Sequence, residues 1–121
     1  MTEREIENAD RSTARERVEA ELLNGTLDFD REVERIKAIG EPTRFIILYL
    51  LAEENQMQSG ELADQLDRKQ NDLYHHLNTL EEAGLVGKFR ENQSRVYELS
   101  PLAEEFVPQL VETIHNRANA V

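Results

Sequence analysis

Hydrophobic residues in the first third of the chain recur every three or four positions, which is the spacing of amphipathic helices. We expect one helix over residues 3–23, stopped by Asn24-Gly25, and a second over residues 29–39, stopped by Gly40. The apolar stripe of the first helix consists of Ile6, Ala14, Val18 and Leu22. The residues expected to face inward from the second helix are Phe29, Val33, Ile36 and Ile39.

The middle of the chain contains a segment that is apolar on nearly all sides, "PTRFIILYLLAEE" from Pro42 to Glu54. Proline suits the first turn of a helix, and apolarity all round predicts that this helix is central. Ser59 is a candidate cap for a short helix over residues 60–67, and "RKQ" then forms a turn into a helix over residues 70–83. The apolar side of that last helix consists of Leu73, Leu77 and Leu80.

After Gly84 the pattern changes to the two-residue alternation of strands, in "LVGKFRENQSRVYELS". Lys88 and Arg90 lie on one face of the first strand, opposite Gly87 and Phe89. The predicted turn is Asn92-Gln93-Ser94, and the predicted return strand is residues 95–99. The pattern therefore predicts a β-hairpin.

The last helix is expected to begin at Ser100-Pro101. Its apolar residues are four positions apart: Leu102, Phe106, Leu110 and Ile114. Pro108 should kink this helix or delay its regular start, because proline lacks the amide hydrogen that a helix interior uses.

The order of these elements predicts a mainly α fold, a winged helix-turn-helix with a two-stranded β wing and extra helices at both ends. We expect an N-terminal helical arm over residues 1–28, a winged helix-turn-helix domain of the DNA-binding kind over 29–99, and a C-terminal dimerisation helix over 100–121. The terminal stripes need a partner, either each other or a second subunit. We favour a homodimer interface formed by Ile6, Val18, Leu22, Leu102, Phe106, Leu110 and Ile114.

Composition complicates a DNA-binding interpretation, because the net charge is -11, with 25 acidic and 14 basic residues. Such a charge repels phosphate, so either the protein binds no nucleic acid or it works in concentrated salt, where the Debye length at 1 M is about 3 Å. Many carboxylates and only three lysines resemble the composition of proteins from halophilic archaea. The charged N-terminus and the lack of a long apolar run favour a cytoplasmic protein without membrane contact.

One face of the helix over residues 70–83 carries side chains suited to reading DNA: Asn71, Tyr74, His75 and Asn78, with Gln70 at the helix start. Asn and Gln pair with adenine, and Tyr and His reach bases or phosphates. The alternative is that this face is merely solvated.

Basic residues near this face favour the DNA interpretation. They lie in the preceding turn and on the hairpin: Arg68, Lys69, Lys88, Arg90 and Arg95. Residues 68–80 carry a net charge of +1 and residues 86–95 carry +2, which leaves -14 on the rest of the chain. The predicted partner is therefore double-stranded DNA, with K⁺ or other ions between the acidic protein and the phosphates.

The segments "IKAIGEPTRFIILYLLAEE", "SGELADQLDRKQNDLYHHLNTLEEAGLV" and "RVYEL" together resemble the ArsR-type winged helix-turn-helix transcriptional regulators. The resemblance implies a homodimer on a palindromic operator, with Gln70, Asn71, Tyr74 and His75 at the reading positions and the hairpin as the wing. The terminal helices are similar to the dimer arms of PadR-like regulators. The acidic format is similar to that of an oxidative-stress regulator of halophilic archaea.

The chain departs from that family at its metal-sensing positions. The cysteine motif of metal-sensing members falls on "MQSGELADQL", and the whole chain contains no cysteine. Other members bind metal between terminal helices, but here Glu112 and His115 lack companion ligands, so we expect neither a metal nor a cofactor. Asp67 and Arg68 replace the small and apolar residues usual in the turn. A redox signal would have to act through Met1 or Met57, a bound ligand or a separate sensor.

Two other functional classes compete with a transcriptional regulator. A winged helix can instead serve as a protein-interaction module that does not read DNA. An enzyme would need His75, His76 and Asp72 to converge, but adjacent helix positions point in different directions, so we expect no catalysis. His76 flanks the leucines and is expected to be structural.

Overall fold

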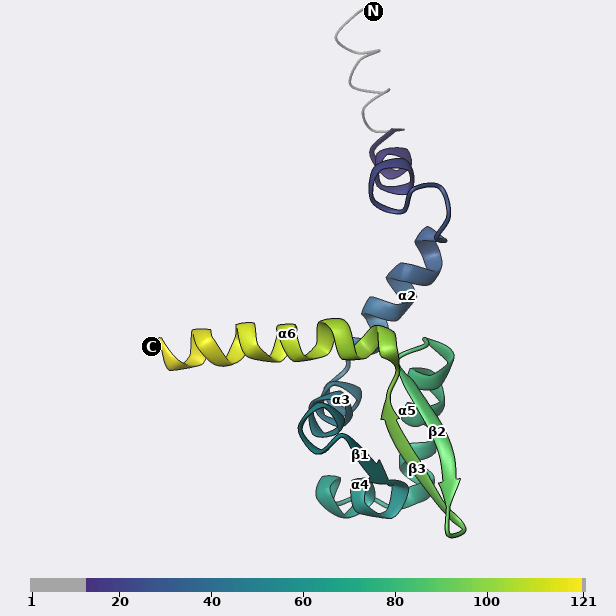
Figure 1. Ribbon diagram of the computed structural model, residues 1–121, viewed down its shortest axis with the longest axis vertical. Coiled ribbons are helices and arrows are strands. Elements are labelled where there is room, and N and C mark those ends of the chain that lie inside the picture. The colour runs from purple at the N-terminus through teal and green to yellow at the C-terminus, as the bar shows by residue number, and fades with distance from the viewer. Residues whose placement is uncertain (1–12, 121) are drawn as a thin grey trace, which may run out of the picture. The chain divides into compact units, whose positions relative to one another are not determined.

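The structure, a computed structural model that describes residues 13–120, divides into two compact units, residues 1–34 and 35–121 (Figure 1). In the first unit, residues 13–17 are α-helical and continue into a π-helical turn, η1 (Val18–Leu22). Asn24 and Gly25 have φ angles of 54° and 65°, so the predicted stop is confirmed. Residues 3–12 of the predicted helix, including Ile6, lie outside the described residues.

The side chain of Arg15 holds the first unit together. Its guanidinium lies 3.2 Å from the Asp30 carboxylate and 4.4 Å from the centre of the Phe29 ring, both at the start of α2 (Phe29–Ile39). Leu23, the residue that follows η1, is buried at 6% exposure, whereas Leu22, the last residue of η1, is 75% exposed. Most of the apolar stripe predicted for this helix is therefore open to solvent.

The end of α2 belongs to the second unit, where it packs through Ala38, which is 3% exposed. The prediction that Ile36 faces inward is wrong, because its side chain is 67% exposed. Positions 36 and 38 lie about 200° apart on a helix, so burial of Ala38 turns Ile36 outward. Arg35 ties the helix to the domain by donating from Nε to the Ala83 carbonyl at 2.8 Å.

Helix α3 (Pro42–Glu54) is the centre of the second unit, as predicted from its apolarity. Ile47, Leu48 and Leu51 are each at most 1% exposed, and the helix contacts the sheet, α5 and α6. Its first turn is capped by the Glu41 carboxylate, which accepts a hydrogen bond from the Arg44 amide at 2.8 Å.

A three-stranded antiparallel sheet replaces the two strands that the sequence pattern predicts. The hairpin of β2 (Val86–Glu91) and β3 (Ser94–Leu99) is confirmed, and β1 (Gln56–Gln58) pairs with the other edge of β3. The hairpin turn has two residues instead of three, Asn92 and Gln93, with φ angles of 51° and 70°. Positive φ angles at both central residues are typical of the two-residue hairpin turn whose twist matches that of the flanking strands.

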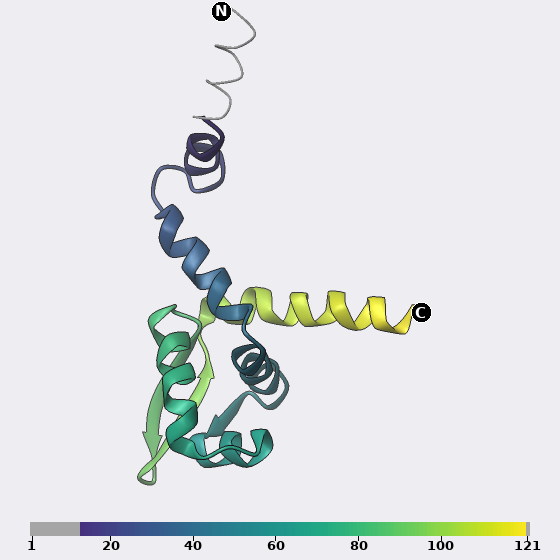
Figure 2. The same ribbon diagram turned by 180° about the vertical axis from the view of Figure 1, so that it is seen from behind.

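The helix-turn-helix consists of α4 (Ser59–Leu66) and α5 (Gln70–Glu82). The prediction that Ser59 caps α4 is wrong, because Ser59 is the first helical residue and the cap position is Gln58. The Glu61 carboxylate accepts from the Gln58 amide at 3.0 Å. Asp67, with a φ of 52°, turns the chain out of α4. From either side of the molecule α5 is seen to cover one face of the β2–β3 hairpin (Figures 1 and 2).

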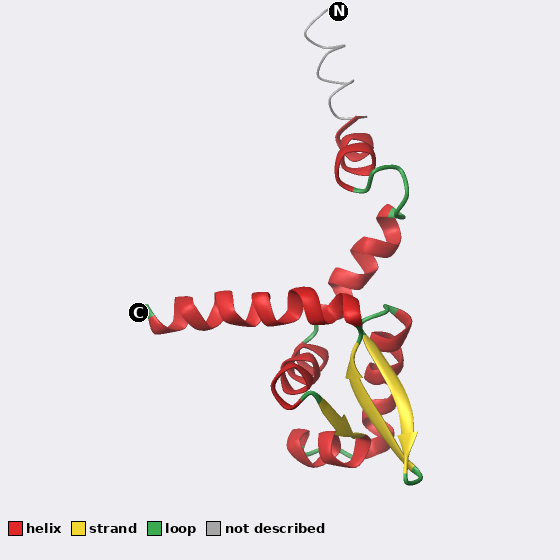
Figure 3. Ribbon diagram, in the orientation of Figure 1, coloured by secondary structure: helices red, strands yellow, loops and turns green. Residues whose placement is uncertain are grey.

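Helix α6 (Pro101–Asn119) begins directly after β3, so Pro108 does not delay its start. Besides the helical bond from the Glu104 amide to its carbonyl, Ser100 makes three hydrogen bonds at this junction. Its hydroxyl donates to the Gly84 carbonyl at 2.7 Å and accepts from the Ala103 amide at 3.1 Å, while its amide donates to the Leu85 carbonyl at 2.9 Å. The first half of α6 buries Ala103 and Val107, and the helix then extends past α3 (Figure 3).

Within residues 13–120, no helix is both long enough and apolar enough to span a membrane.

Candidate nucleic-acid interface

The inner face of α5 fixes which of its side chains reach solvent. Leu73, Leu77 and Leu80 are each 0% exposed and belong to the hydrophobic core. Because they occupy one side of the helix, the opposite side is forced outward. Asn71, His75 and Asn78 are all exposed on that side, in line with the predicted face.

Gln70 and Tyr74 differ from these three residues because they hydrogen-bond within the domain. The Gln70 carboxamide oxygen accepts from the Ser59 hydroxyl at 3.2 Å and from the Tyr74 hydroxyl at 3.4 Å. Tyr74 is half-buried and packs against the core. Of the five predicted recognition-helix residues, two are therefore tied to the protein itself.

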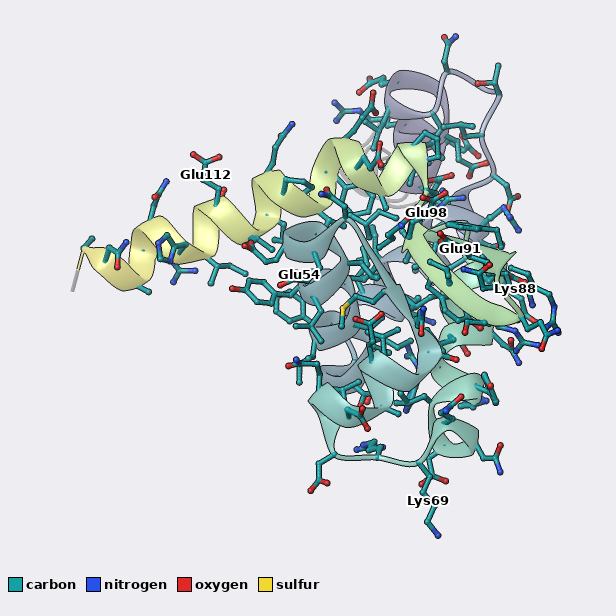
Figure 4. The ribbon with its side chains drawn as sticks, turned by 60° about the horizontal axis from the view of Figure 1, so that its bottom comes forward. Glu54, Lys69, Lys88, Glu91, Glu98 and Glu112 are labelled. Carbon is teal, nitrogen blue, oxygen red and sulfur yellow. The ribbon has the colours of Figure 1, made fainter. Side chains whose placement is uncertain are left out.

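The turn before α5 carries exposed cations. Arg68 and Lys69 are both exposed, and the Lys69 side chain points away from the domain (Figure 4). These two residues and Asn71 line a polar hollow of about 600 Å³ over the turn. Two cations thus lie beside the first turn of α5, together with Asp64 in the same hollow and Asp72 in the first turn itself.

The three wing cations share one face of the hairpin. The register pairs Lys88 with Tyr97 and Arg90 with Arg95, and directly paired residues point to the same side of a sheet. This is the side that α5 covers, since the Lys88 ammonium lies 3.5 Å from the Glu81 carboxylate on that helix. Glu81 therefore partly neutralises Lys88.

Arg90 and Arg95 have different surroundings despite facing each other across the hairpin. The Arg95 guanidinium lies over the Tyr74 ring, 5.0 Å from its centre. The phenol of Tyr97 is the main cause of a raised pKa of Arg95, so this side chain stays charged. Arg90 donates to the Gln93 carbonyl at 3.5 Å, its one hydrogen bond in the part of the chain that the structure describes. Both arginines line a smaller polar hollow of about 280 Å³ between the wing and the start of α4.

His76 lies on the inner side of α5, as predicted, in a cluster that the sequence did not reveal. Its Nδ1 lies 3.2 Å from Arg44 Nη1 and 3.5 Å from Glu41 Oε2. Arginine only donates, so Nδ1 accepts and a neutral His76 carries its proton on Nε2. Arg44 also donates to the Ala38 carbonyl at 2.8 Å, so the cluster joins α2, α3 and α5.

The pKa values of His76 and Glu41 are both lowered in this cluster, but for different reasons. Burial is the main reason that the pKa of His76 falls below 6.5; Glu41 opposes this shift and Arg44 adds to it. For Glu41, burial alone would raise the pKa, but the Arg44 and Thr43 amides, followed by His76 and Arg44, bring it below 4.5. Near neutral pH the cluster therefore holds a neutral histidine between a carboxylate and a guanidinium.

The sequence signals for these supporting residues were weak. Glu41 before Pro42 is a recognisable helix start, but Glu is an uncommon cap. The contact between Arg44 and His76 spans 32 positions of sequence, and no local pattern predicts it.

Glu112 and His115 line an apolar cavity between α3 and α6, and His115 Nε2 lies 3.1 Å from Asn119 Nδ2. Among residues 13–120, no three His, Asp or Glu side chains are placed together to hold a metal ion.

Several known proteins are similar to this chain in sequence and in fold. A family model described as a helix-turn-helix domain matches residues 39–86. An HTH-type transcriptional regulator of Methanocaldococcus jannaschii is 39% identical over 69 residues, which are 57% of this chain and 78% of that protein. The transcriptional activator HlyU of Vibrio cholerae is 32% identical over 84 residues, which are 69% of this chain and 77% of HlyU.

The fold comparison agrees. The structure of HlyU from Vibrio cholerae superposes with a TM-score of 0.64 at 30% identity, covering 69% of this chain and 91% of that one. The chain belongs to the ArsR-like winged helix-turn-helix transcriptional regulators. A homodimeric winged helix-turn-helix DNA-binding domain from Mycobacterium bovis, described as a possible ArsR-family regulator, has a TM-score of 0.63 at 25% identity and covers 84% of this chain and 85% of that one.

The His76 cluster makes the stability of this regulator sensitive to acid. A histidine whose pKa is lower in the folded state stabilises the fold fully above the unfolded value of 6.5, and this stabilisation is lost as the pH falls below it. Glu41 adds a further loss below 4.5, since the unfolded chain again binds the proton more readily. We expect the urea midpoint to fall between pH 7.5 and 5.5, and to fall less in His76→Gln.

His115→Gln is the matched control, because it changes a histidine on α6 that contacts Asn119 and takes no part in the cluster. It should keep the pH dependence of the unmodified regulator. If His76→Gln and the unmodified protein lost stability in parallel, another group would be responsible.

Proposed function

We propose that this regulator reads a palindromic DNA operator as a homodimer, with α5 in the major groove and the wing along the neighbouring backbone. The observation that carries the proposal is the outward face of α5. Asn71, His75 and Asn78 are exposed there, next to Arg68 and Lys69, on a chain that is otherwise strongly acidic. A face needed only for solubility would not require this local reversal of charge.

The chemistry of this face suits base reading in the first two turns of α5. A recognition helix enters the major groove with its N-terminal residues leading, which presents Asn71 first and His75 one turn later. The Asn71 carboxamide can pair with both N6 and N7 of adenine, and the His75 ring can donate to an acceptor such as guanine N7. Arg68, Lys69 and Arg90 would meet phosphates on either side of the groove.

Substitution of the reading residues should change specificity. Asn71→Ala or His75→Ala should cost about 1–3 kcal/mol at one base pair of each half-site and leave affinity for unrelated duplexes little changed. The measurement is selection from a duplex library with a randomised core of about 24 base pairs, followed by titration of the selected and scrambled sequences. Arg90→Ala is the contrasting variant and should weaken all duplexes alike. The opposite pattern, with specificity changed by the wing variant alone, would contradict the proposed docking.

The dimer is supported by apolar surface that the second unit leaves uncovered. Leu102, Leu110 and Ile114 on α6 are 40%, 36% and 43% exposed. On α3, Ile46 and Tyr49 are 43% and 41% exposed, and a cavity of about 590 Å³ lies between the two helices. The last turns of α6 have little packing within this unit, and such a helix segment is marginal without a partner. The M. bovis relative is itself homodimeric.

A charge placed on the apolar side of α6 should separate the subunits. Ile114→Glu would bury a carboxylate in the proposed interface, and we expect the dimer dissociation constant to rise at least tenfold, by roughly 1.4 kcal/mol or more. Light scattering should show twice the 14.0 kDa chain mass for the unmodified protein and a shift toward one chain mass for the variant. Asn119→Glu, which adds the same charge at an exposed position about 100° or more around the helix from Leu102, Leu110 and Ile114, should stay dimeric. A monomeric unmodified protein would overturn the arrangement.

The acidic balance supports a further proposal, that this regulator works in concentrated salt with K⁺ between its carboxylates and the DNA phosphates. At about 1 M salt the Debye length is about 3 Å, so repulsion by the distant acidic surface is screened while close contacts persist. Ordinary regulators lose affinity steeply as salt rises, because binding releases counterions.

We therefore expect the affinity for the selected operator to persist or increase between about 0.1 M and 2 M KCl, measured by fluorescence anisotropy. The selected and scrambled duplexes serve as a matched pair at each concentration. A steep loss of affinity would contradict the proposed salt adaptation alone. Absence of binding at every concentration would contradict the DNA-reading function and favour a protein-interaction module.

A further inference from the structure

Two side-chain contacts join the wing of this regulator to the recognition helix, the Lys88–Glu81 ion pair and the stacking of Arg95 on Tyr74. Arg95 extends from β3 so that its guanidinium lies 5.0 Å from the centre of the Tyr74 ring. That distance is within the range in which a cation is attracted to a ring face. Arg95 is half-buried and Tyr74 packs against the core, so the contact is partly shielded from water.

Tyr74 is in turn held at its hydroxyl end. The hydroxyl donates to the Gln70 carboxamide oxygen at 3.4 Å, and the same oxygen accepts from the Ser59 hydroxyl at 3.2 Å. Ser59 is 6% exposed at the start of α4. A continuous path thus runs from α4 through α5 to the wing.

The residue opposite Arg95 provides an internal comparison. Arg90 is paired with Arg95 across the hairpin and carries the same side chain, but it is exposed, and within residues 13–120 its one hydrogen bond is to the Gln93 carbonyl, at 3.5 Å. A phosphate contact needs a guanidinium that is available to the ligand. Arg90 meets this condition, whereas Arg95 would have to leave the Tyr74 ring.

We propose that Arg95 and Tyr74 form a brace that fixes the wing against α5, with Gln70 orienting the Tyr74 ring, so that Arg95 is a positioning residue and not a phosphate contact. The same assignment leaves base reading to Asn71, His75 and Asn78. The brace is a property of the free protein, while its consequence for DNA rests on the proposed function. In the brace, Tyr74 and Arg95 jointly order the part of the wing near its turn, while the Lys88–Glu81 pair and the buried Tyr97 hold the rest, so loss of either brace residue loosens that part.

The first test needs no DNA. Amide hydrogen exchange of the hairpin, residues 88–97, is compared in Tyr74→Leu, Arg95→Gln and the double variant. The brace predicts that each single variant speeds exchange about three- to tenfold and that the double variant adds nothing further. Tyr74→Phe keeps the ring and should retain most of the protection, which also guards against a folding defect in Tyr74→Leu. Arg90→Gln is the matched control and should leave exchange unchanged. Additive effects, or equal loss in Tyr74→Phe and Tyr74→Leu, would overturn the brace.

The second test uses the operator and measures the slope of log affinity against log salt. Loss of one phosphate contact shifts this slope by about 0.9 toward positive values, whatever the slope of the unmodified protein, and this is the result expected for Arg90→Gln. Arg95→Gln should lower affinity without changing the slope, and Arg95→Lys, which keeps the charge but not the planar stacking, should not restore affinity. The positioning role would be overturned if Arg95→Gln shifted the slope of log affinity against log salt by about 0.9 toward positive values and Arg95→Lys restored the original slope. If the unmodified protein bound no duplex, the proposed function would fail while the exchange measurement still decided the brace.

Discussion

The position of every side chain offered by α5 depends on the burial of three leucines beneath it. Leu73, Leu77 and Leu80 are fully enclosed, and burying each leucine stabilises the fold by about 1.5–3 kcal/mol. Rotating the helix by one residue, about 100°, would expose part of this set and bury polar groups that have no partners there. The core therefore sets the outward face, and the choice of Asn71 and His75 is free to serve recognition.

Periodicity was sufficient to predict most of the second unit. The leucine side of α5, the alternation of the wing and the start of α6 after Ser100 all follow from local spacing, and the structure agrees. Prediction failed where the deciding contact was distant or the segment short. β1 has only three residues and shows no usable period, and Ile36 was misplaced because Ala38, a weaker hydrophobic signal, faces the core.

The candidate site was predictable in its composition but not in its division of roles. A helical wheel groups Gln70 and Tyr74 with Asn71 and His75, because it contains no information about neighbouring elements. The structure adds Ser59 from α4 and Arg95 from β3, and these partners separate the residues that bond internally from those that face solvent. The charge count has the same limit, since Glu81 partly offsets Lys88.

Ser100 restricts how α6 can move relative to α5. Its hydroxyl and amide join the end of α5, the beginning of β2 and the first turn of α6 within a single residue. Two short hydrogen bonds from one side chain leave little freedom for α6 to pivot against the end of α5. If two copies associate through α6, this joint, together with the packing of Ala103 and Val107, sets the separation of their α5 helices and so the spacing of half-sites that the pair can span.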